Sequence, residues 1–236
     1  MVSVHAISFD VWDTMLDINK VFSLIASKLS IHLPNTDVAK VLETIRVVYD
    51  RCKLRRRLGE VDGFDIVVES QNMLAERLGI ETNKVLQAIS DAFASADPKD
   101  IVFGDVVDTL ELLHRLGFKL GIVGNTVFWS SIYTIDILKR LGIYNMFEVL
   151  IFSDETRINK PDRKIFFIFA KKIGEEPKRI AHVGDSVIED VGGALSAGMK
   201  AIHIDRRRGR NKLVLKDLGL ALIGEFPQII EVLEEL

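Results

Sequence analysis

The chain has 236 residues and a formal net charge of −3, with 48% hydrophobic and 28% charged residues. This composition is typical of a soluble globular protein, and no apolar run approaches the ~20 residues that a membrane-spanning helix needs. Acidic and basic residues are interspersed, which argues against a nucleic-acid partner. Residues 1–9 lack the pattern of a secretion signal. The single cysteine, Cys52, excludes an internal disulfide and favours a reducing, cytoplasmic location.

The first predicted strand is an apolar run that ends at Asp10 and continues into Trp12, Asp13 and Thr14. A carboxylate at the end of a buried strand needs a cation, a metal or a hydrogen-bond donor, because an anion that loses water without one is strongly destabilised. On this segment alone, a solvated strand end and a catalytic nucleophile are equally good interpretations of Asp10.

Residues 17–96 have the pattern of helices rather than strands. Apolar residues recur at helical spacing in four stretches, 21–29, 38–48, 66–78 and 85–93, and Pro34, Gly63, Gly79 and Pro98 punctuate them. The sequence therefore predicts an inserted domain of four helices over residues 17–96, with hinges near 16–19 and 94–100.

From residue 105 onward, predicted helices and strands alternate. The strands are expected at 119–123, 149–152, 180–184, 201–204 and 221–223. The helices are expected up to about 115, then at 128–141 and 162–173, between the strands at 180–184 and 201–204, and after Pro227. This alternation predicts an α/β fold, a doubly wound Rossmann-like parallel sheet covered on both faces, built from residues 1–16 and 97–236.

Several polar residues follow these strands directly. The strand at 119–123 ends in Gly124, Asn125 and Thr126, and the strand at 180–184 runs into Asp185, with Asp190 five residues later. A further candidate, Lys160, stands before Pro161 at a predicted helix start. Open α/β folds bind ligands at the carboxyl ends of their strands, so these side chains are expected to gather at one edge of the sheet.

This ordered set of motifs resembles the haloacid dehalogenase superfamily of hydrolases over nearly the whole chain outside the inserted helices. The resemblance implies that Asp10 is the nucleophile, that Asn125 with Thr126 forms the end of the second motif, and that Lys160 is the lysine of the third motif. It also implies that the inserted helices form a cap, which closes over the active site and selects substrates.

The resemblance further implies a phosphohydrolase that uses Mg²⁺ and passes through an aspartyl phosphate, with a small phosphorylated molecule as substrate. Mg²⁺ prefers hard oxygen ligands, which Asp10, Asp185, Asp190 and the backbone oxygen of Trp12 offer. The oligomeric state is left open by the sequence.

Two positions depart from the family pattern. Trp12 stands where the family's phosphatases carry a general acid, and Gly124 stands where they carry a hydroxyl, so slow turnover is expected. Asp13 is expected to point away from the site, because strand side chains alternate between faces; it reaches the site only if the strand breaks there. Thr126 is a candidate to replace the hydroxyl.

An aromatic residue at position 12 is similar to the tyrosine of the metal-free 2-haloacid dehalogenases, which makes dehalogenation an alternative. The acidic turn at Asp185 favours the phosphatase, because metal-free dehalogenases typically carry Ser and Asn there. A third alternative is a non-catalytic member of the family that binds a phosphorylated ligand.

A run of basic residues ends the second inserted helix: Arg51, Lys53, Arg55, Arg56 and Arg57. Such a run is usually a solvated helix end that complements the helix dipole. The functional alternative is that one or two of its arginines, with Arg51 and Arg55 as the candidates, join Trp12 and Gly124 in binding the substrate.

Overall fold

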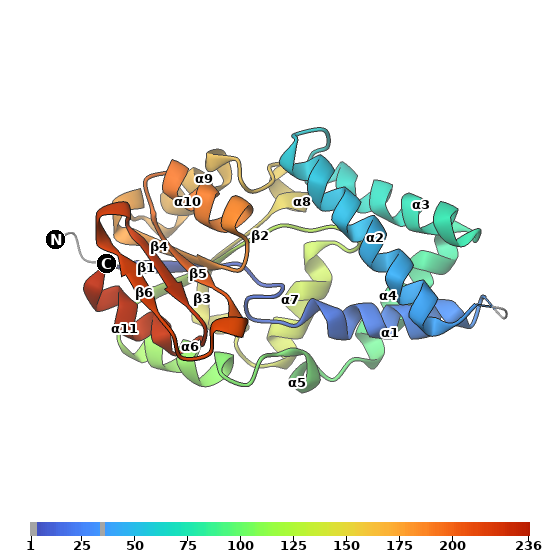
Figure 1. The fold of residues 1–236 in the computed structure, drawn as a ribbon, viewed down its shortest axis with the longest axis horizontal. Helices are drawn as coiled ribbons and strands as arrows, with labels where there is room; N and C mark the ends of the chain where they lie inside the picture. The colour runs from blue at the N-terminus through green and yellow to red at the C-terminus, as the bar shows by residue number, and fades with distance from the viewer. Residues whose placement is uncertain (1–3, 34–35) are drawn as a thin grey trace.

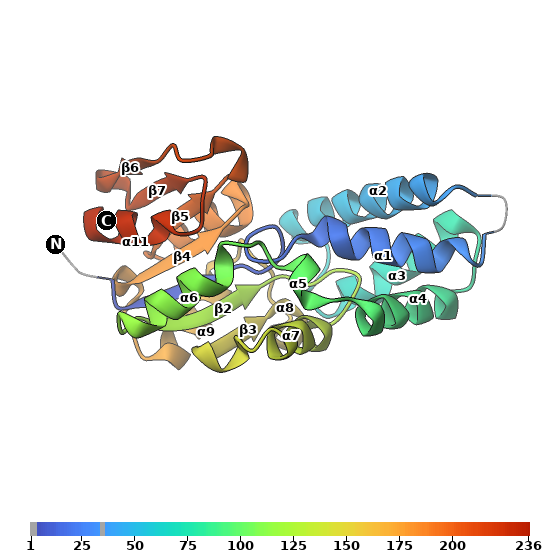
Figure 2. The same ribbon diagram turned by 90° about the horizontal axis from the view of Figure 1, so that it is seen from below.

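A computed structural model describes residues 4–33 and 36–236, so residues 1–3 and Pro34, which were part of the predictions above, lie outside the described residues. The core is a seven-stranded sheet in the order β3-β2-β1-β4-β5-β7-β6 (Figure 2). Every neighbouring pair is parallel except β6 with β7. The predicted doubly wound α/β fold is therefore confirmed. The strands are β1 Ala6–Phe9, β2 Lys119–Gly124, β3 Phe147–Phe152, β4 Ile180–Gly184, β5 Lys200–Ile204, β6 Leu213–Leu215 and β7 Leu220–Ile223.

Helices cover both faces of this sheet (Figure 1). On one face lie α9 (Arg163–Ile173) and α10 (Gly193–Ser196), and on the other lie α6 (Val106–Arg115) and α11 (Gln228–Glu235). The central strands β1 and β4 are buried along their whole length. This is why they read as continuous apolar runs rather than as alternating patterns.

Four further helices form a bundle beyond the carboxyl ends of the strands, at the right of Figure 1. They are α1 Ile18–Ser30, α2 Val38–Arg57, α3 Asp65–Leu78 and α4 Thr82–Ser95. Two of them begin at aspartates: the Asp17 side chain accepts a hydrogen bond from Asn19 N at 2.9 Å, and the Asp37 side chain accepts one from Ala39 N at 3.3 Å. Such caps satisfy backbone donors that the first helical turn leaves free.

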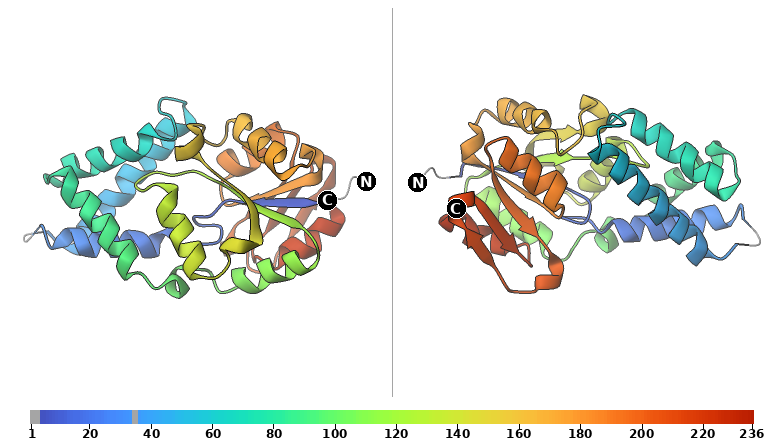
Figure 3. Two further views of the ribbon diagram at one scale, coloured as in Figure 1. Left: turned by 180° about the vertical axis from the view of Figure 1, so that it is seen from behind. Right: turned by 45° about the horizontal axis from the view of Figure 1, so that its top comes forward.

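The two segments that join bundle and core run side by side. The backbone N–H of Asp17 donates to Ile101 O at 2.9 Å, and that of Phe103 donates to Met15 O at 3.0 Å, next to the short helix α5 (Pro98–Ile101). Helix α7 (Ser131–Arg140) lies between sheet and bundle (Figure 3), and its Arg140 donates to backbone oxygens at the end of α4.

The structure differs from the sequence-based expectation in three elements. The helix predicted from residue 128 begins at Ser131, because Phe128 and Trp129 are buried in a loop that packs against the bundle. Strand β6, a three-residue edge, was not predicted, and the expected helix after β4 begins as a π-helix, Val187–Gly192. The remaining short helices are α8 Ser153–Thr156 and the 3₁₀ turns Tyr144–Met146, Pro177–Arg179, Arg206–Arg208 and Lys216–Leu218. Within residues 4–33 and 36–236, no helix is both long and apolar enough to cross a membrane.

Candidate active site

Three carboxylates meet where the sheet changes winding direction. From β1 the chain proceeds to β2 on one side, whereas β4 and β5 lie on the other side of β1. Asp10 follows β1, and Asp185 and Asp190 follow β4. One oxygen from each of the three lies within 4.8 Å of the others. Such a switch point is where open α/β sheets bind ligands, and the structure brings these three carboxylates together there.

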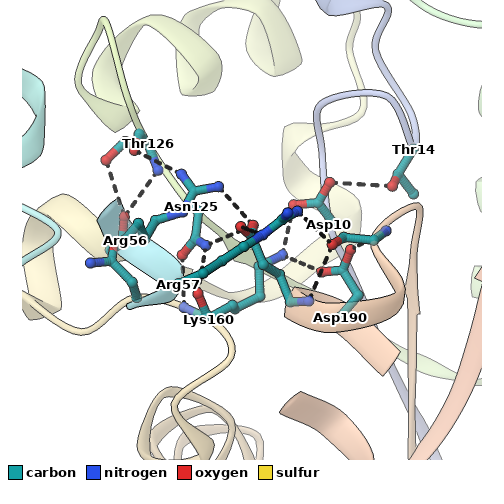
Figure 4. A network of polar contacts seen from close by, with 12 residues as sticks. Asp10, Thr14, Arg56, Arg57, Asn125, Thr126, Lys160 and Asp190 are labelled. Carbon is teal, nitrogen blue, oxygen red and sulfur yellow. Dashed lines mark hydrogen bonds and ion pairs between the residues drawn. The ribbon is translucent and has the colours of Figure 1, made fainter. Parts of the chain in front are cut away.

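Lys160 joins two of these carboxylates (Figure 4). Its Nζ donates to Asp10 Oδ1 at 2.7 Å and to Asp190 Oδ1 at 2.6 Å, and its side chain is 1% exposed. Asn125 fixes the backbone of Lys160 from both sides: Lys160 N donates to Asn125 Oδ1 at 2.9 Å, and Asn125 Nδ2 donates to Lys160 O at 3.1 Å. The other oxygen of Asp10 accepts a bond from Thr14 Oγ1 at 3.2 Å.

Asp190 is the most fully bonded member of the group. Besides Lys160, it is bonded to His182 Nε2 at 3.1 Å and accepts from the backbone N–H of Ser186 at 2.9 Å. Burial alone would raise the pKa of Asp190, but the Lys160 ammonium and His182 hold this pKa well below its ordinary value. Burial also lowers the pKa of His182, so the ring is neutral, and its Nδ1 accepts from the Ser8 hydroxyl at 2.8 Å.

Asp185 has the opposite environment. Burial, and then the charges of Asp190 and Asp10, raise the pKa of Asp185 to about 8. Within the described residues, its carboxylate accepts no hydrogen bond. An acid that is crowded by like charges and has free oxygens is stabilised in its charged form by a cation. The hard oxygen donors of Asp10 and Asp185 fit Mg²⁺.

The acidic cluster opens into a cleft between core and bundle. From the core, Trp12, Asp13, Phe128 and Trp129 contribute to its walls. The bundle contributes Ile18, Tyr49, Lys53 and Arg56, and the rest of the lining comes from Asp10, Asn125, Thr126, Val127, Asp185, Ser186, Glu189 and Asp190.

Asp13 lies in this cleft and does not point away, because the strand breaks at this residue. The chain leaves its strand geometry at Asp13, where φ is 62°, and this left-handed conformation overrides the alternation of a regular strand. Burial raises the pKa of the Asp13 carboxyl to about 6.

The two departures from the family pattern have structural reasons. Trp12 donates from its indole Nε1 to Thr134 Oγ1 at 3.3 Å, and its ring meets that of Trp129 edge-on at 5.1 Å. At Gly124, a Cβ atom would lie 2.9 Å from the ring of Phe152, so the ring excludes a larger residue. Gly124 is not among the residues that line the cleft.

Thr126 does not direct its hydroxyl toward Asp10. The Oγ1 atom lies 3.1 Å from Ser153 Oγ and donates to Gly63 O at 3.4 Å, while its backbone N–H donates to Ser153 Oγ at 3.0 Å. Gly63 belongs to the loop between α2 and α3, and a Cβ on it would lie 2.2 Å from Ser153 O. This close approach ties the loop to the core beside the cleft.

The structure does not bring Arg51 and Arg55 to the cleft. Arg51 is exposed, and Arg55 pairs with Glu60 at 3.5 Å and with Glu69. The cleft instead receives Lys53 and Arg56. The apolar positions of α2 set its helical phase and so indicate in principle which basic side chains face the cleft. The basic run occupies every side of the helix end, however, so composition alone did not separate Lys53 and Arg56 from Arg51 and Arg55.

Glu189 is a residue of the site that the sequence analysis missed. It is 4% exposed and accepts from Arg56 Nη2 at 2.7 Å, from Arg57 Nε at 2.9 Å and from Asn125 Nδ2 at 3.2 Å. Through these bonds, the end of α2 is connected to the same asparagine that positions Lys160. Its partners come from a distant part of the chain, so no local pattern marked it.

A family model described as "haloacid dehalogenase-like hydrolase" matches residues 4–198. Among curated proteins, the glyceraldehyde 3-phosphate phosphatase of Methanopyrus kandleri is 33% identical over 145 residues, which are 59% of this chain and 58% of that protein. The chain thus spans little more than half the length of this relative.

Solved structures of two kinds share the fold. The putative HAD-hydrolase YfnB from Bacillus subtilis, bound to magnesium, has a TM-score of 0.78 at 18% identity, covering 98% of this chain and 99% of that one. A 2-haloacid dehalogenase from Pseudomonas syringae has a TM-score of 0.65 at 21% identity, with coverage of 98% and 99%. At these identities, both likenesses show the fold alone.

Proposed function

Because the chain belongs to the haloacid dehalogenase-like hydrolases, we propose that it is a Mg²⁺-dependent phosphohydrolase acting on a small phosphorylated metabolite. The observation that carries the proposal is the contact of Lys160 Nζ with Asp10 at 2.7 Å, beside two further carboxylates within 4.8 Å. A carboxylate can attack an anionic phosphoryl group only where positive charge neutralises both, and this site concentrates the groups that do so. The phosphatase activity of the 33% identical relative adds support.

In the proposed reaction, one carboxylate oxygen of Asp10 forms a bond to phosphorus while the bond to the leaving-group oxygen breaks. The aspartyl phosphate is then attacked by water, which releases phosphate and restores the carboxylate. Covalent catalysis of this kind divides one difficult displacement into two easier ones. Lys160 offsets the charge of the phosphoryl group, and Asn125 holds Lys160 in place.

Bound Mg²⁺ would screen the nucleophile from the phosphate and hold the two in line. We assign Asp10, Asp185, Asp190 and the backbone oxygen of Trp12 as its protein ligands. Asp190 already accepts bonds from Lys160 and Ser186. Its main task in this scheme is therefore to hold the ammonium group, while Asp185 has oxygens free for the metal.

Trp12 provides no acid for the leaving group, because its indole N–H is bonded to Thr134. General acid catalysis typically contributes about 10²–10⁴-fold in rate. Turnover of ordinary phosphomonoesters is therefore slow in this proposal, while acyl and aryl phosphates, whose leaving groups need no proton, react faster.

The aromatic residue at position 12 favours one rival, a metal-free 2-haloacid dehalogenase, in which Asp10 would attack carbon instead. Asp185 opposes this rival, because its crowded carboxylate has no task in a reaction without metal. The remaining rival is a member that binds a phosphorylated ligand without turnover.

One panel of assays separates the three. Hydrolysis of p-nitrophenyl phosphate and acetyl phosphate is measured with Mg²⁺ or with EDTA, alongside halide release from 2-chloropropionate. Phosphate release that EDTA and Asp10→Asn both abolish is the expected result. Halide release that EDTA leaves unchanged would overturn the proposal, and phosphate analogues that raise the melting temperature without any turnover would indicate the binding protein.

Residues 17–96 form the cap in this proposal and residues 1–16 and 97–236 the core domain, because Ile18, Tyr49, Lys53 and Arg56 of the bundle line one side of the cleft. The buried free thiol of Cys52 fits a reducing compartment, which supports a cytoplasmic location.

A further inference from the structure

One face of α2 points into the cleft. Tyr49, Lys53 and Arg56 are spaced by four and three residues, the spacing that places side chains on one side of a helix, and all three line the cleft opposite the acidic cluster. Together they offer a phenol, an ammonium and a guanidinium group. Burial holds the pKa of Tyr49 well above its ordinary value, so its hydroxyl is neutral.

Lys53 is a cation of the cleft that has no carboxylate of its own. Lys160 is shared by Asp10 and Asp190, and Arg56 and Arg57 share Glu189. Across the described residues, no carboxylate lies within ion-pair distance of Lys53. Its Nζ lies 5.2 Å from the centroid of the Tyr49 ring, a cation–π contact that leaves its hydrogen-bond donors free.

Arg56, which also lines the cleft, has one unused donor. It is 5% exposed, its Nη2 donates to Glu189 at 2.7 Å, and its Nη1 donates to Thr126 O at 3.4 Å. The remaining nitrogen, Nε, is buried without a hydrogen-bond partner. Buried donors of this kind are costly when unpaired, and a ligand that supplies an acceptor removes the cost.

We propose that Lys53 and Arg56 bind a carboxylate on the leaving group of the substrate, so that the enzyme selects small phosphomonoesters that carry a carboxylate. One ammonium and one free guanidinium N–H match the two oxygens of a carboxylate better than the three of a second phosphate. The inference rests on the proposed phosphatase function, because Lys160 and the metal site take the phosphoryl group in the same cleft.

The test compares 2-phosphoglycolate with 2-hydroxyethyl phosphate, which has an alcohol in place of the carboxylate. Both are assayed with Mg²⁺ on the wild type and on Lys53→Met, Lys53→Arg and Arg51→Met. Arg51→Met is the matched control, because it removes a charge from the exposed side of the same helix. The readout is the ratio of the two kcat/KM values.

We expect the wild type to favour phosphoglycolate. Lys53→Met should lower kcat/KM for phosphoglycolate by about tenfold to a hundredfold, the usual range for a lost hydrogen bond to a charged group, mainly through KM. The value for the alcohol should change much less, Lys53→Arg should recover part of the preference, and Arg51→Met should keep it. An equal loss on both substrates, or no loss on phosphoglycolate, would overturn the inference.

A failure of the proposed function gives a different result. If the wild type hydrolyses neither compound nor acetyl phosphate, the phosphatase proposal fails, and calorimetric binding of phosphoglycolate to wild type and to Lys53→Met decides the inference separately. Equal affinities would overturn it, whereas weaker binding to Lys53→Met alone would support a carboxylate subsite in a protein without turnover.

Discussion

Lys160 is a buried cation whose charge stabilises two buried carboxylates. Its side chain is 1% exposed and lies within 2.7 Å of Asp10 and 2.6 Å of Asp190. Removing one partner of a buried ion pair typically costs about 3–5 kcal/mol, because the remaining charge is left uncompensated. We expect Lys160→Met to lose about this much unfolding free energy in urea titrations, and the double variant with Asp190→Asn to recover part of it.

The control for this prediction is Lys164→Met. The Lys164 ammonium group is exposed and lies 3.9 Å from Asp162, so its removal should leave stability nearly unchanged. Two results would contradict the argument. One is an equal loss of unfolding free energy in Lys160→Met and Lys164→Met. The other is a loss in the Lys160→Met, Asp190→Asn double variant that equals the sum of the two single losses.

The pKa of Asp185 predicts how stability depends on pH. This carboxyl has an ordinary pKa of 3.8 and a folded-state pKa of about 8, so the folded protein binds more protons between these values. Stability must then fall as the pH rises toward 8. The lowered pKa of His182 gives a small opposing change just above its ordinary 6.5, and the Asp13 pKa of about 6 lies below this range, so the Asp185 carboxyl dominates between pH 6.5 and 8.

The measurement is the urea midpoint at pH 6.5 and at pH 8 in EDTA. We expect a lower midpoint at pH 8 for the wild type, and a flatter profile for Asp185→Asn, whose amide does not titrate. Added Mg²⁺ should raise the midpoint most at pH 8, because a metal competes with the proton. A wild-type profile as flat as that of Asp185→Asn would refute this account.

Among single residues, those that follow strands were predictable. Asp10, Asn125 and Asp185 stand directly after apolar runs, and a parallel sheet brings such positions together whatever the rest of the chain does. Glu189 was not predictable, because it lies in the cleft only through Arg56 and Arg57, which belong to another part of the chain. The position of Asp13 in the cleft depends on its positive φ, which the neighbouring residues in the sequence do not indicate.

The end of α2 and the π-helix after β4 are held together by Glu189. Its carboxylate receives Arg56 at 2.7 Å and Arg57 at 2.9 Å, and the loop that follows α2 places Gly63 N against Arg157 O at 3.3 Å. We expect Glu189→Gln to weaken this contact and to speed hydrogen exchange at the amides of residues 58–63, because an amide pairs poorly with two guanidinium groups.

Exchange measured by mass spectrometry checks this prediction. Glu60→Gln is the control, because Glu60 is half exposed and its partner Arg55 faces away from the cleft. If Glu189→Gln leaves exchange in the 58–63 loop at the wild-type rate, the ion pairs of Glu189 do not hold the helix end, and the contacts of Val61, Asp62 and Gly63 with the core secure the loop without them.

At the level of helices and strands, the apolar patterns were sufficient to predict those elements that are buried on one side or on all sides. The four bundle helices bury one stripe each, as their periodicity predicted, and β1, β4 and the apolar part of β2 are buried. Strand β6 was not predicted, because three partly exposed residues are too few to show the alternation of a strand. The start of α7 was misplaced because Phe128 and Trp129 are apolar for packing against the bundle and not for helix formation.

The bundle and one face of the sheet share a continuous hydrophobic cluster, which includes Val41 and Ile45 of α2 as well as Phe9 and Ile122 of the sheet. Phe93 of α4 lies at the junction, with ring centroids 5.1 Å from Trp129 and 6.4 Å from Trp12. A core that spans both parts should make them unfold together.

The two tryptophans of the chain, Trp12 and Trp129, both lie at this junction, so intrinsic fluorescence reports on it directly while circular dichroism reports on all helices. We expect the two signals to give one coincident transition in urea. Phe93→Ala should lower both midpoints together and cost about 3–5 kcal/mol, as large-to-small core changes do. Leu86→Ala, at a 46% exposed position of the same helix, should change stability far less. A fluorescence transition that precedes the circular dichroism transition would show instead that the bundle separates from the core before either unfolds.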